Sequence, residues 1–446
     1  MKRISRNTPA GSAALALLAA ALVPAALAAQ QPPVATVTLD EAIARSVAVD
    51  PAAVAAASGI SSARADVLQS RGAWLPTLSL GSTYANSSNE RFDQATGSLV
   101  SENYTAQLAT GLELFDGGRR LAEGRSASAR QRAATATYRE QRYETALLTT
   151  ETFYGAAAAD ELVAAARQRL ERARQQLEFA RTRLEVGTAT RSDVLRAELE
   201  AGNAELAVVE AESALRTSRL QLGQRIGVAG EVQPAAAALP ERGPQLPAEA
   251  ELVARAERTA PAAQAARAGF DERRAVRIAA TTSYAPTLRA TAGYDWSAFD
   301  FPPDERSWSL RLIASLPVLN GFQREANVAR ARASERAAEA RAADATIAAR
   351  VAAADAAREI GSAERRVEIA RRSVELARED LRVQEERYRL GASTILDLQA
   401  SQVALTEAEV GWVRARQGLG VAVARLEAVL GETVRPQAPA PGISQD

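Results

Sequence analysis

Two long runs of the chain carry a seven-residue apolar repeat that no proline interrupts. The large residues of the repeat are Val163, Leu170, Leu177 and Leu184 in the first run, and Val367, Val374, Leu381 and Tyr388 in the second. This spacing predicts helices that pair as left-handed coiled coils. Because residues 119–186 and 322–390 contain no proline, each run predicts a single helix of roughly 100 Å. No single globular core accommodates a helix of that length.

The same unit occurs twice along the chain. Pro76 matches Pro286 at an offset of 210 residues, whereas Gly187 matches Gly391 at an offset of 204. Six residues are therefore missing from one connection of the second copy, in what the polar sequence indicates is a surface loop. The two copies fill nearly the whole chain, which predicts two tandem repeats.

Each copy begins with two segments in which apolar and polar residues alternate, as in strands with one apolar face. The aromatic residues gather near the loop end of that face, at Tyr84, Tyr104, Tyr294, Trp296 and Trp308. An ordinary half-buried sheet has the same alternation, but an aromatic girdle opposite a polar face is typical of outer-membrane barrels. Such a barrel needs about eight or more strands. Four strands cannot close one, so copies of the chain would have to share it.

These patterns predict a mainly α-helical protein with a small β part. We expect a signal peptide at 1–29, a first repeat at 35–230, a linker at 231–250, a second repeat at 251–432 and a disordered tail at 433–446. The first repeat should hold strands at about 76–90 and 103–115 and long helices at about 118–186 and 191–228. The second should hold strands at about 286–298 and 307–317 and long helices at about 321–390 and 394–431.

Composition indicates the cellular compartment of the protein and excludes several classes of catalytic chemistry. Residues 1–29 place basic residues before an apolar stretch that ends in small residues, which is the build of a cleaved secretory signal. Acidic and basic residues balance, which argues against nucleic acid as a partner. The chain has no histidine and no cysteine, so most nucleophilic and metal chemistries lack their usual groups. We therefore expect no catalytic residues, no cofactor and no metal site, although hydrolysis by carboxylates alone stays open by composition.

Each long helix ends at the same kind of turn, "VGTATRSD" at 186–193 and "LGASTILD" at 390–397. Gly187 and Gly391 suit the left-handed position that ends a helix. A threonine three residues before an aspartate then matches a capping box that starts the next helix, in the pairs Thr190 with Asp193 and Thr394 with Asp397. Two helical hairpins per chain would thus place four helix ends at one pole.

The doubled unit, "LFDGG" and "VLNG" after the strands, and "RYRLGASTILDLQA" at the second turn resemble the TolC family of outer-membrane efflux proteins over residues 35–432. The resemblance implies a homotrimer with one shared 12-stranded barrel in the outer membrane and a periplasmic tube of helices. It also implies a passive exit duct of a tripartite efflux or type I secretion system. A periplasmic adaptor, or membrane fusion protein, and an inner-membrane transporter would supply substrate and energy. The turns at Gly187, Thr190, Gly391 and Thr394 would dock the adaptor.

The family closes its tube with a tyrosine and an arginine of the second turn, bonded to an acid of the first repeat, and with rings of aspartate. Tyr388 matches the tyrosine, Asp193 the first-repeat acid and Asp397 the first aspartate ring. The resemblance thus implies a periplasmic gate at these residues. Both aspartates also cap helices, and Tyr388 occupies a seam position of the heptads, so purely structural roles stay open for all three.

Two further positions of the family's gate differ in this sequence. Ser393 stands where the arginine is expected, and Ala400 stands where the second aspartate is expected. Arg389, next to Tyr388, and Arg191 are the candidates for the missing arginine. A non-conducting coiled-coil scaffold in the periplasm is the alternative function. It would not explain the amphipathic strands, and the cargo of a duct is not encoded in these motifs.

Overall fold

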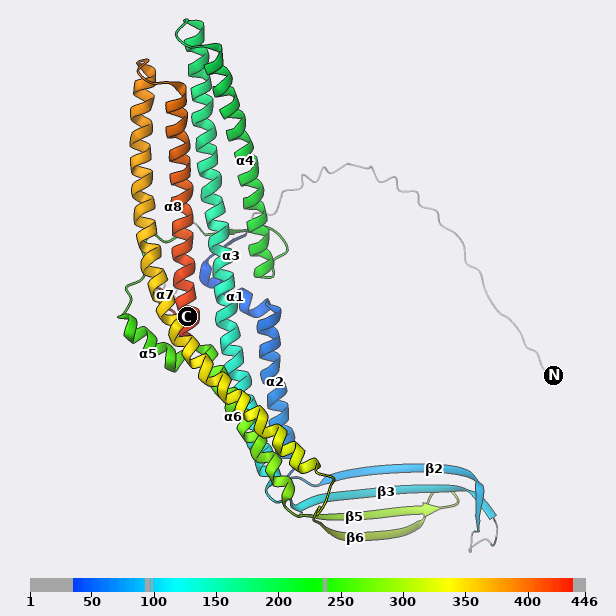
Figure 1. Ribbon diagram of the computed structural model, residues 1–446. Coiled ribbons are helices and arrows are strands. Elements are labelled where there is room, and N and C mark those ends of the chain that lie inside the picture. The colour runs from blue at the N-terminus through cyan, green and yellow to red at the C-terminus, as the bar shows by residue number, and fades with distance from the viewer. Residues whose placement is uncertain (1–34, 93–96, 98, 236–238, 436–446) are drawn as a thin grey trace, which may run out of the picture. The chain divides into compact units, whose positions relative to one another are not determined.

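The structure is a computed structural model that describes residues 35–92, 97, 99–235 and 239–435 (Figure 1). The expected signal peptide at 1–29 lies outside the described residues. The described chain is mostly helical with a small part of β-structure, as its heptads and alternating segments predicted. Residues 35–435 lie within one compact unit.

The elements follow one another in the same order in both halves. The first half contains β1 (Ala35–Val37), α1 (Leu39–Val49), α2 (Pro51–Gly72), β2 (Thr77–Phe92), β3 (Leu99–Phe115), α3 (Arg119–Glu185) and α4 (Arg191–Arg225). The second half contains β4 (Val232–Pro234), α5 (Glu249–Thr259), α6 (Pro261–Thr281), the 3-10 turn η1 (Thr282–Tyr284), β5 (Thr287–Ala298), β6 (Glu305–Ser315), α7 (Gln323–Arg389) and α8 (Ile395–Leu430). The helices α3 and α7 each span 67 residues.

The four long strands form one antiparallel sheet in the order β2-β3-β5-β6. Tyr84 pairs with Tyr104 in β2 and β3, and Tyr294 pairs with Trp308 in β5 and β6. The aromatic residues thus share the apolar face that the alternation predicted. The strands β2 and β3 extend further into the loop than expected, because Phe92 still pairs with Leu99 beyond a shift in the register.

The long helices lie in a row. α4 packs on α3, α3 packs on α8, and α8 packs on α7, so α4 and α7 are the outer members (Figure 1). Near the turns, one buried cluster joins the two hairpins through Ala180, Ala197, Tyr388 and Ile395. Toward the sheet, α2 packs on α3, α3 on α6, and α6 on α7. The small seam residues, mostly alanines, allow this close approach of helices.

Several shorter elements were not expected from the sequence. Thr38 caps α1 by accepting a hydrogen bond from the Glu41 amide at 3.4 Å, and Asp50 caps α2 by accepting one from the Ala53 amide at 3.1 Å. These are ordinary N-terminal caps, and α2 has Pro51 in its first turn. None of the described helices is by itself long and apolar enough to cross a membrane. The pair α1 and α2, bent by 57°, meets that test only when taken together.

The expected linker at 231–250 contains a strand and crosses the second hairpin. β4 pairs in parallel with β1. Beyond it, the Leu239 carbonyl accepts a hydrogen bond from Arg416 of α8 at 2.8 Å, and the Gly243 amide donates one to Glu364 of α7 at 3.0 Å. The linker therefore ties α7 and α8 together at one level of the row.

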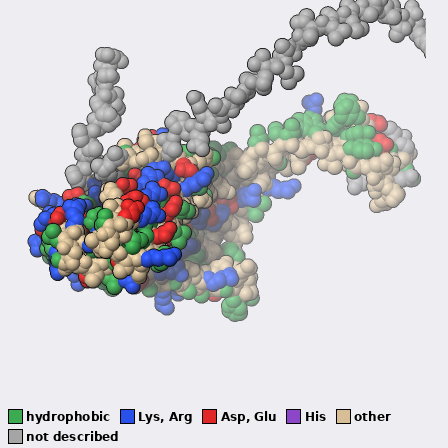
Figure 2. Space-filling view, turned by 90° about the horizontal axis from the view of Figure 1, so that it is seen from above, with side chains coloured by type: hydrophobic (Ala, Val, Ile, Leu, Met, Phe, Trp, Pro, Cys, Tyr) green, Lys and Arg blue, Asp and Glu red, His purple; other side chains and the backbone are tan. Residues whose placement is uncertain are grey.

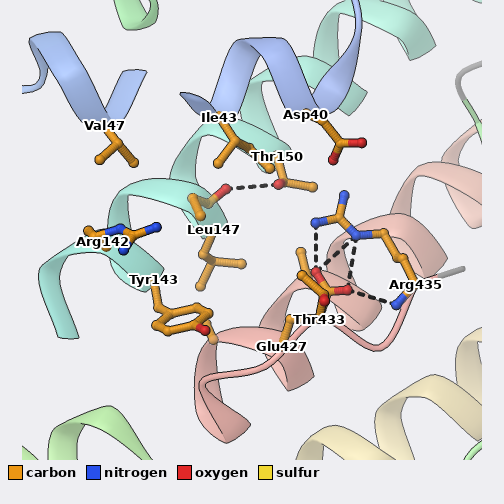
Figure 3. A pocket seen from close by; sticks show the side chains of 13 residues that line it. Asp40, Ile43, Val47, Arg142, Tyr143, Leu147, Thr150, Glu427, Thr433 and Arg435 are labelled. Atoms are coloured by element: carbon orange, nitrogen blue, oxygen red, sulfur yellow. Dashed lines mark hydrogen bonds and ion pairs between the residues drawn. The ribbon is translucent and has the colours of Figure 1, made fainter. Parts of the chain in front are cut away.

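The tail begins later than predicted. The expected start of disorder at 433 is wrong for the first residues, because the Val434 and Arg435 amides both donate to Glu427 Oε1 at 2.9 Å. The Arg435 guanidinium also pairs with Glu427 at 2.7 Å beside a pocket lined by α1, α3 and α8 (Figure 3). Glu427 is buried at the end of α8, and a buried carboxylate requires partners of this kind. Residues 436–446 lie outside the described part.

Two joints connect the sheet to the long helices. The first joint, residues 116–120, leads from β3 into α3, and the second joint, residues 320–324, leads from the β6 hairpin into α7. Gly117 and Gly321 adopt left-handed backbone at φ 65° and 63°. Each joint also stacks an arginine on an aromatic ring. Arg120 lies 4.3 Å from the Trp74 ring centre, and Arg324 lies 4.8 Å from that of Tyr284.

Candidate functional site: the helical turns and the seam between the hairpins

The two turns have the capping geometry that the sequence predicted. Gly187 and Gly391 are left-handed, at φ 74° and 75°. In the first turn Asp193 accepts hydrogen bonds from the Thr190 amide and hydroxyl, both at 2.8 Å. The same pair of bonds to Asp397 measures 2.9 and 2.8 Å in the second turn, where Thr394 is the donor. Both aspartates are thus engaged as caps within their own turns.

These caps change the acidity of the second turn. Hydrogen bonds from the Thr394 amide and hydroxyl lower the pKa of Asp397, because they favour its charged form. Asp397 is solvent-exposed.

Tyr388 is buried between the two hairpins. Its side chain is 5% exposed, and its ring meets that of Phe179 edge-on at 5.8 Å. Burial raises the pKa of Tyr388, and the positive charge of Arg183 acts against that rise. The ring therefore packs α7 against α3, and the structural role that its heptad position suggested is real.

Arg183 of α3 is the residue that the sequence analysis missed. Its Nη1 donates to the Tyr388 carbonyl at 2.7 Å, and its Nη2 donates to the Thr188 carbonyl at 3.3 Å. Its guanidinium also lies 5.0 Å from the Tyr388 ring centre. One arginine of the first hairpin thus binds the end of α7 and its own turn together. No motif marks it, because its main partner is 205 residues away.

Arg389 and Arg191, the two arginine candidates from the sequence, are both exposed. Arg389 pairs with Glu386 of its own helix at 3.2 Å, and its side chain is 63% exposed. Ser393 holds the position expected for an arginine, and its buried hydroxyl has no hydrogen-bond partner in the described part of the chain. Ala400 is exposed on α8. The structure therefore brings Asp193, Asp397 and Tyr388 to one end of the row, with Arg183 rather than Arg389 against Tyr388.

Charged contacts continue along the seam between the hairpins, away from the turns. Arg172 of α3 lies 3.5 Å from Glu409 of α8, whose other oxygen lies 3.4 Å from Arg378 of α7. Further along, Arg416 pairs with Glu161 at 2.8 Å. The α3 residues of the seam are thus 161, 172 and 183, spaced eleven apart. The side chains of the Arg416–Glu161 pair are 10% and 35% exposed, and those of the Arg172–Glu409 pair are 22% and 9% exposed, so both contacts between α3 and α8 are partly shielded from solvent.

The end of the molecule that carries the turns is charged. Figure 2 looks onto this end and shows arginine and acidic side chains mixed over it, whereas hydrophobic side chains gather along one side of the strands. Among the residues that the structure describes, no three acidic side chains are grouped so as to hold a metal ion. The site is therefore a charged pole of helix ends, with a buried aromatic contact beneath it.

Comparisons with known proteins identify the family and the fold of the chain. The sequence model of the outer membrane efflux protein family matches residues 40–228 and 252–432. Protein CyaE of Bordetella pertussis is 27% identical over 363 residues, which cover 79% of this chain and 74% of that protein. A membrane protein from Pseudomonas aeruginosa superposes with a TM-score of 0.76 at 19% identity, over 90% of this chain and 91% of that one. VceC of Vibrio cholerae superposes with a TM-score of 0.74 at 17% sequence identity, over 89% of this chain and 97% of that one.

The chain belongs to the outer membrane efflux protein family. It is an exit duct of the outer membrane that extends into the periplasm and passively conducts substrates of efflux or secretion. The solved structures add the fold, a small sheet joined to long helices. Proteins of this family are channels rather than enzymes.

Proposed function

We propose that three copies of the chain form one duct, a 12-stranded barrel that continues into a tube of helices. The observation that carries this proposal is the four-stranded sheet, whose outer strands β2 and β6 pair on one side only in the described chain. Exposed strand edges are not tolerated in lipid, and a closed barrel removes them. Three sheets joined edge to edge give a barrel within the known size range.

The outer helices support the same assembly. α7 exposes Ile369, Leu376 and Val383 at seven-residue spacing, and Leu390 continues this spacing just after the helix. α4 exposes Leu199, Leu206 and Leu220 at multiples of seven. Exposed apolar stripes of this kind require a partner. In a ring of copies, α4 of one protomer would meet α7 of the next through a heptad seam, as α3 meets α4 within a protomer.

The constriction of this duct would lie at the turns. Asp193 and Asp397 would line it, and Tyr388 would hold the second hairpin against the first. Arg183 takes the place of the arginine that the second turn lacks, because it binds the Tyr388 carbonyl and stacks on the Tyr388 ring. Arg389 would then contribute charge to the entrance and no bond to the closed state.

The periplasmic adaptor and the inner-membrane transporter would meet the duct at the same pole. Gly187, Thr190, Gly391 and Thr394 all lie at exposed positions of the two turns. Two similar helix-turn-helix tips per protomer give six related docking positions per trimer, which suits a partner that also repeats around the axis. The transporter supplies the energy, since a duct of this kind is passive.

Single-channel recording in planar bilayers tests the constriction. We expect small, cation-selective currents from the wild type and larger currents from Arg183→Ala, because that variant loses the bond between Arg183 and the end of α7. Asp193→Ala combined with Tyr388→Phe should also increase the current and reduce cation selectivity. Arg389→Ala is the matched control, since it removes one arginine near the same turn but no bond to Tyr388.

The comparison between the two arginine variants decides the proposal. Equal currents from Arg183→Ala and the wild type would place the constriction away from this contact. A larger current from Arg389→Ala than from Arg183→Ala would return the latch to the second turn. Sedimentation of the same samples checks the trimer independently of conduction.

A further inference from the structure

A groove lined by arginines runs between α2 and α3, next to the sheet. Its volume is about 310 Å³, and its lining includes Arg71, Arg120, Arg125 and Arg132 with Trp74 and Leu121. No acidic residue lines it. Trp74 lies three residues before the first residue of β2. The groove therefore sits at the end of the helices from which the strands leave.

Three of these arginines have no acidic partner among the described residues. Arg120 is neutralised by Asp116, which its Nε contacts at 2.8 Å. Arg71, Arg125 and Arg132 are exposed and form no ion pair among the described residues. Three like charges around one groove repel one another unless an anion lies between them, so the groove is suited to a phosphate or another compact anion.

The edge of the groove is apolar. Trp74 is 54% exposed, Leu121 is 51% exposed, and Leu75, adjacent to Trp74, is 67% exposed. Large apolar side chains beside free arginines are unfavourable in water, but this mixture is typical of side chains at the headgroup level of a membrane. A free phosphate would leave these three side chains in water. A phospholipid would cover them with its chains while its headgroup binds the arginines.

The second repeat provides an internal comparison. Its Tyr284 and Arg324 repeat the stacked pair of Trp74 and Arg120. Three other positions differ, because Arg71 is replaced by Thr281, Arg125 by Ala329 and Leu121 by Glu325, whereas Arg132 corresponds to Arg336. The fold of the joint therefore does not require Arg71 or Arg125.

We propose that the α2–α3 groove binds the headgroup phosphate of an anionic phospholipid in the periplasmic leaflet of the outer membrane. Arg71, Arg125 and Arg132 hold the phosphate, and Trp74 and Leu121 contact the adjoining chains. The site rests on the proposed duct, because that assembly places the strands in the membrane and the groove at its periplasmic surface. Three such sites per trimer fix the height of the barrel in the bilayer.

Native mass spectrometry of the full-length protein in detergent tests the site. The protein is titrated with phosphatidylglycerol, with phosphatidylcholine and with inorganic phosphate. We expect up to three phosphatidylglycerol molecules per trimer and weaker binding of phosphatidylcholine. Arg71→Thr combined with Arg125→Ala copies the second repeat and should weaken phosphatidylglycerol binding about 30-fold, at about 1 kcal/mol for each arginine near a headgroup.

The matched control is Arg341→Ala combined with Arg350→Ala, which removes two exposed arginines of α7. This variant should bind phosphatidylglycerol as the wild type does. Equal loss in both double variants would show a general charge effect and overturn the site. Inorganic phosphate that displaces phosphatidylglycerol at equal concentration would assign the groove to soluble anions and overturn the lipid.

The same spectra separate this inference from the proposed function. A trimer without preference for phosphatidylglycerol overturns the lipid site alone. A monomer that keeps the preference, and loses it in Arg71→Thr with Arg125→Ala, supports the site and overturns the trimer.

Discussion

The first and second joints have similar backbones and different chemistry. In the first, Asp116 accepts hydrogen bonds from the Arg120 amide and guanidinium at 2.9 and 2.8 Å, and both side chains are 5% exposed. In the second, Asn320 replaces the aspartate, and its Oδ1 and the Nε of Arg324 are both buried without a partner among the described residues. Arg324 donates instead to the Pro317 and Val318 carbonyls.

This difference shows that the turn and the stacked aromatic ring define the joint, whereas the buried ion pair is an addition to the first copy. The first joint is also the tighter one. A methyl group on Gly117 would overlap the Cβ of Ala285, whereas one on Gly321 would meet nothing within 4 Å. Substitutions at equivalent positions can therefore separate packing, charge and backbone strain.

The largest effect is expected for Gly117→Ala. Left-handed backbone costs a residue with a Cβ roughly 1–2 kcal/mol, and overlap with Ala285 adds roughly 1–3 kcal/mol. Gly321→Ala carries the backbone cost alone, so it should be the milder substitution. Thermal unfolding of the purified protein, followed by circular dichroism, measures both variants. Equal midpoints for the two would mean that the contact with Ala285 has no energetic weight.

The next largest effect on stability is expected for Asp116→Asn, which introduces into the first joint the asparagine that the second joint has at position 320. It leaves the Arg120 charge buried without its counterion, so the free energy of unfolding should fall by about 3 kcal/mol. Denaturant titration at pH 7 measures the loss. Asp66→Asn is the control, because Asp66 pairs with Arg130 at a much more exposed position and should lose less than about 1 kcal/mol. If Asp66→Asn lowered the free energy of unfolding as much as Asp116→Asn, burial of the ion pair would not explain the effect at Asp116.

The effect of Asp116→Asn should depend on pH. Burial raises the pKa of Asp116, but hydrogen bonds from the Arg120 amide and guanidinium outweigh it, so the pKa is lowered on folding. A lowered pKa gives stability that is present above the unfolded value, near 3.9, and is lost as pH falls through the folded value. The difference between wild type and variant should therefore shrink below about pH 4. Unfolding midpoints measured between pH 7 and pH 3 check this, and a constant difference would contradict an ionic origin.

The smallest effect is expected for the reverse substitution, Asn320→Asp. It places a carboxylate beside the unpaired Nε of Arg324, where a charge-assisted hydrogen bond should raise the free energy of unfolding by about 1 kcal/mol. The same denaturant titration measures the gain. Combination with Arg324→Gln should abolish it, because the counterion is then missing. A gain that survives this second substitution would rule out pairing with Arg324.

The sequence predicted those parts of the fold that local rules determine. Alternation located the four strands, and the Gly, Thr and Asp pattern located both turns and their caps. The helices α1 and α2 were missed, although Thr38 with Glu41 and Asp50 with Pro51 are the cap signals that could have found them. The tail was misjudged because its composition resembles disorder, whereas its anchor depends on one buried acid, Glu427.

The candidate site was predictable only where residues act within one turn. Asp193 and Asp397 follow from capping alone. The role of Arg183 could not be predicted in this way, because it depends on a hydrogen bond to Tyr388. Tyr388 lies against α3 only once the two hairpins have packed together. The sequence offered Arg389 by proximity along the chain. In the folded chain, the Arg389 side chain forms an ion pair with Glu386.

The spacing of contacts along α3 has a mechanical consequence. Toward α4 its seam repeats every seven residues, which winds paired helices to the left, while toward the second hairpin its charged contacts recur every eleven residues, which winds them to the right. A helix held by both neighbours can satisfy neither twist fully. Release of either neighbour would therefore let α3 coil further around the other.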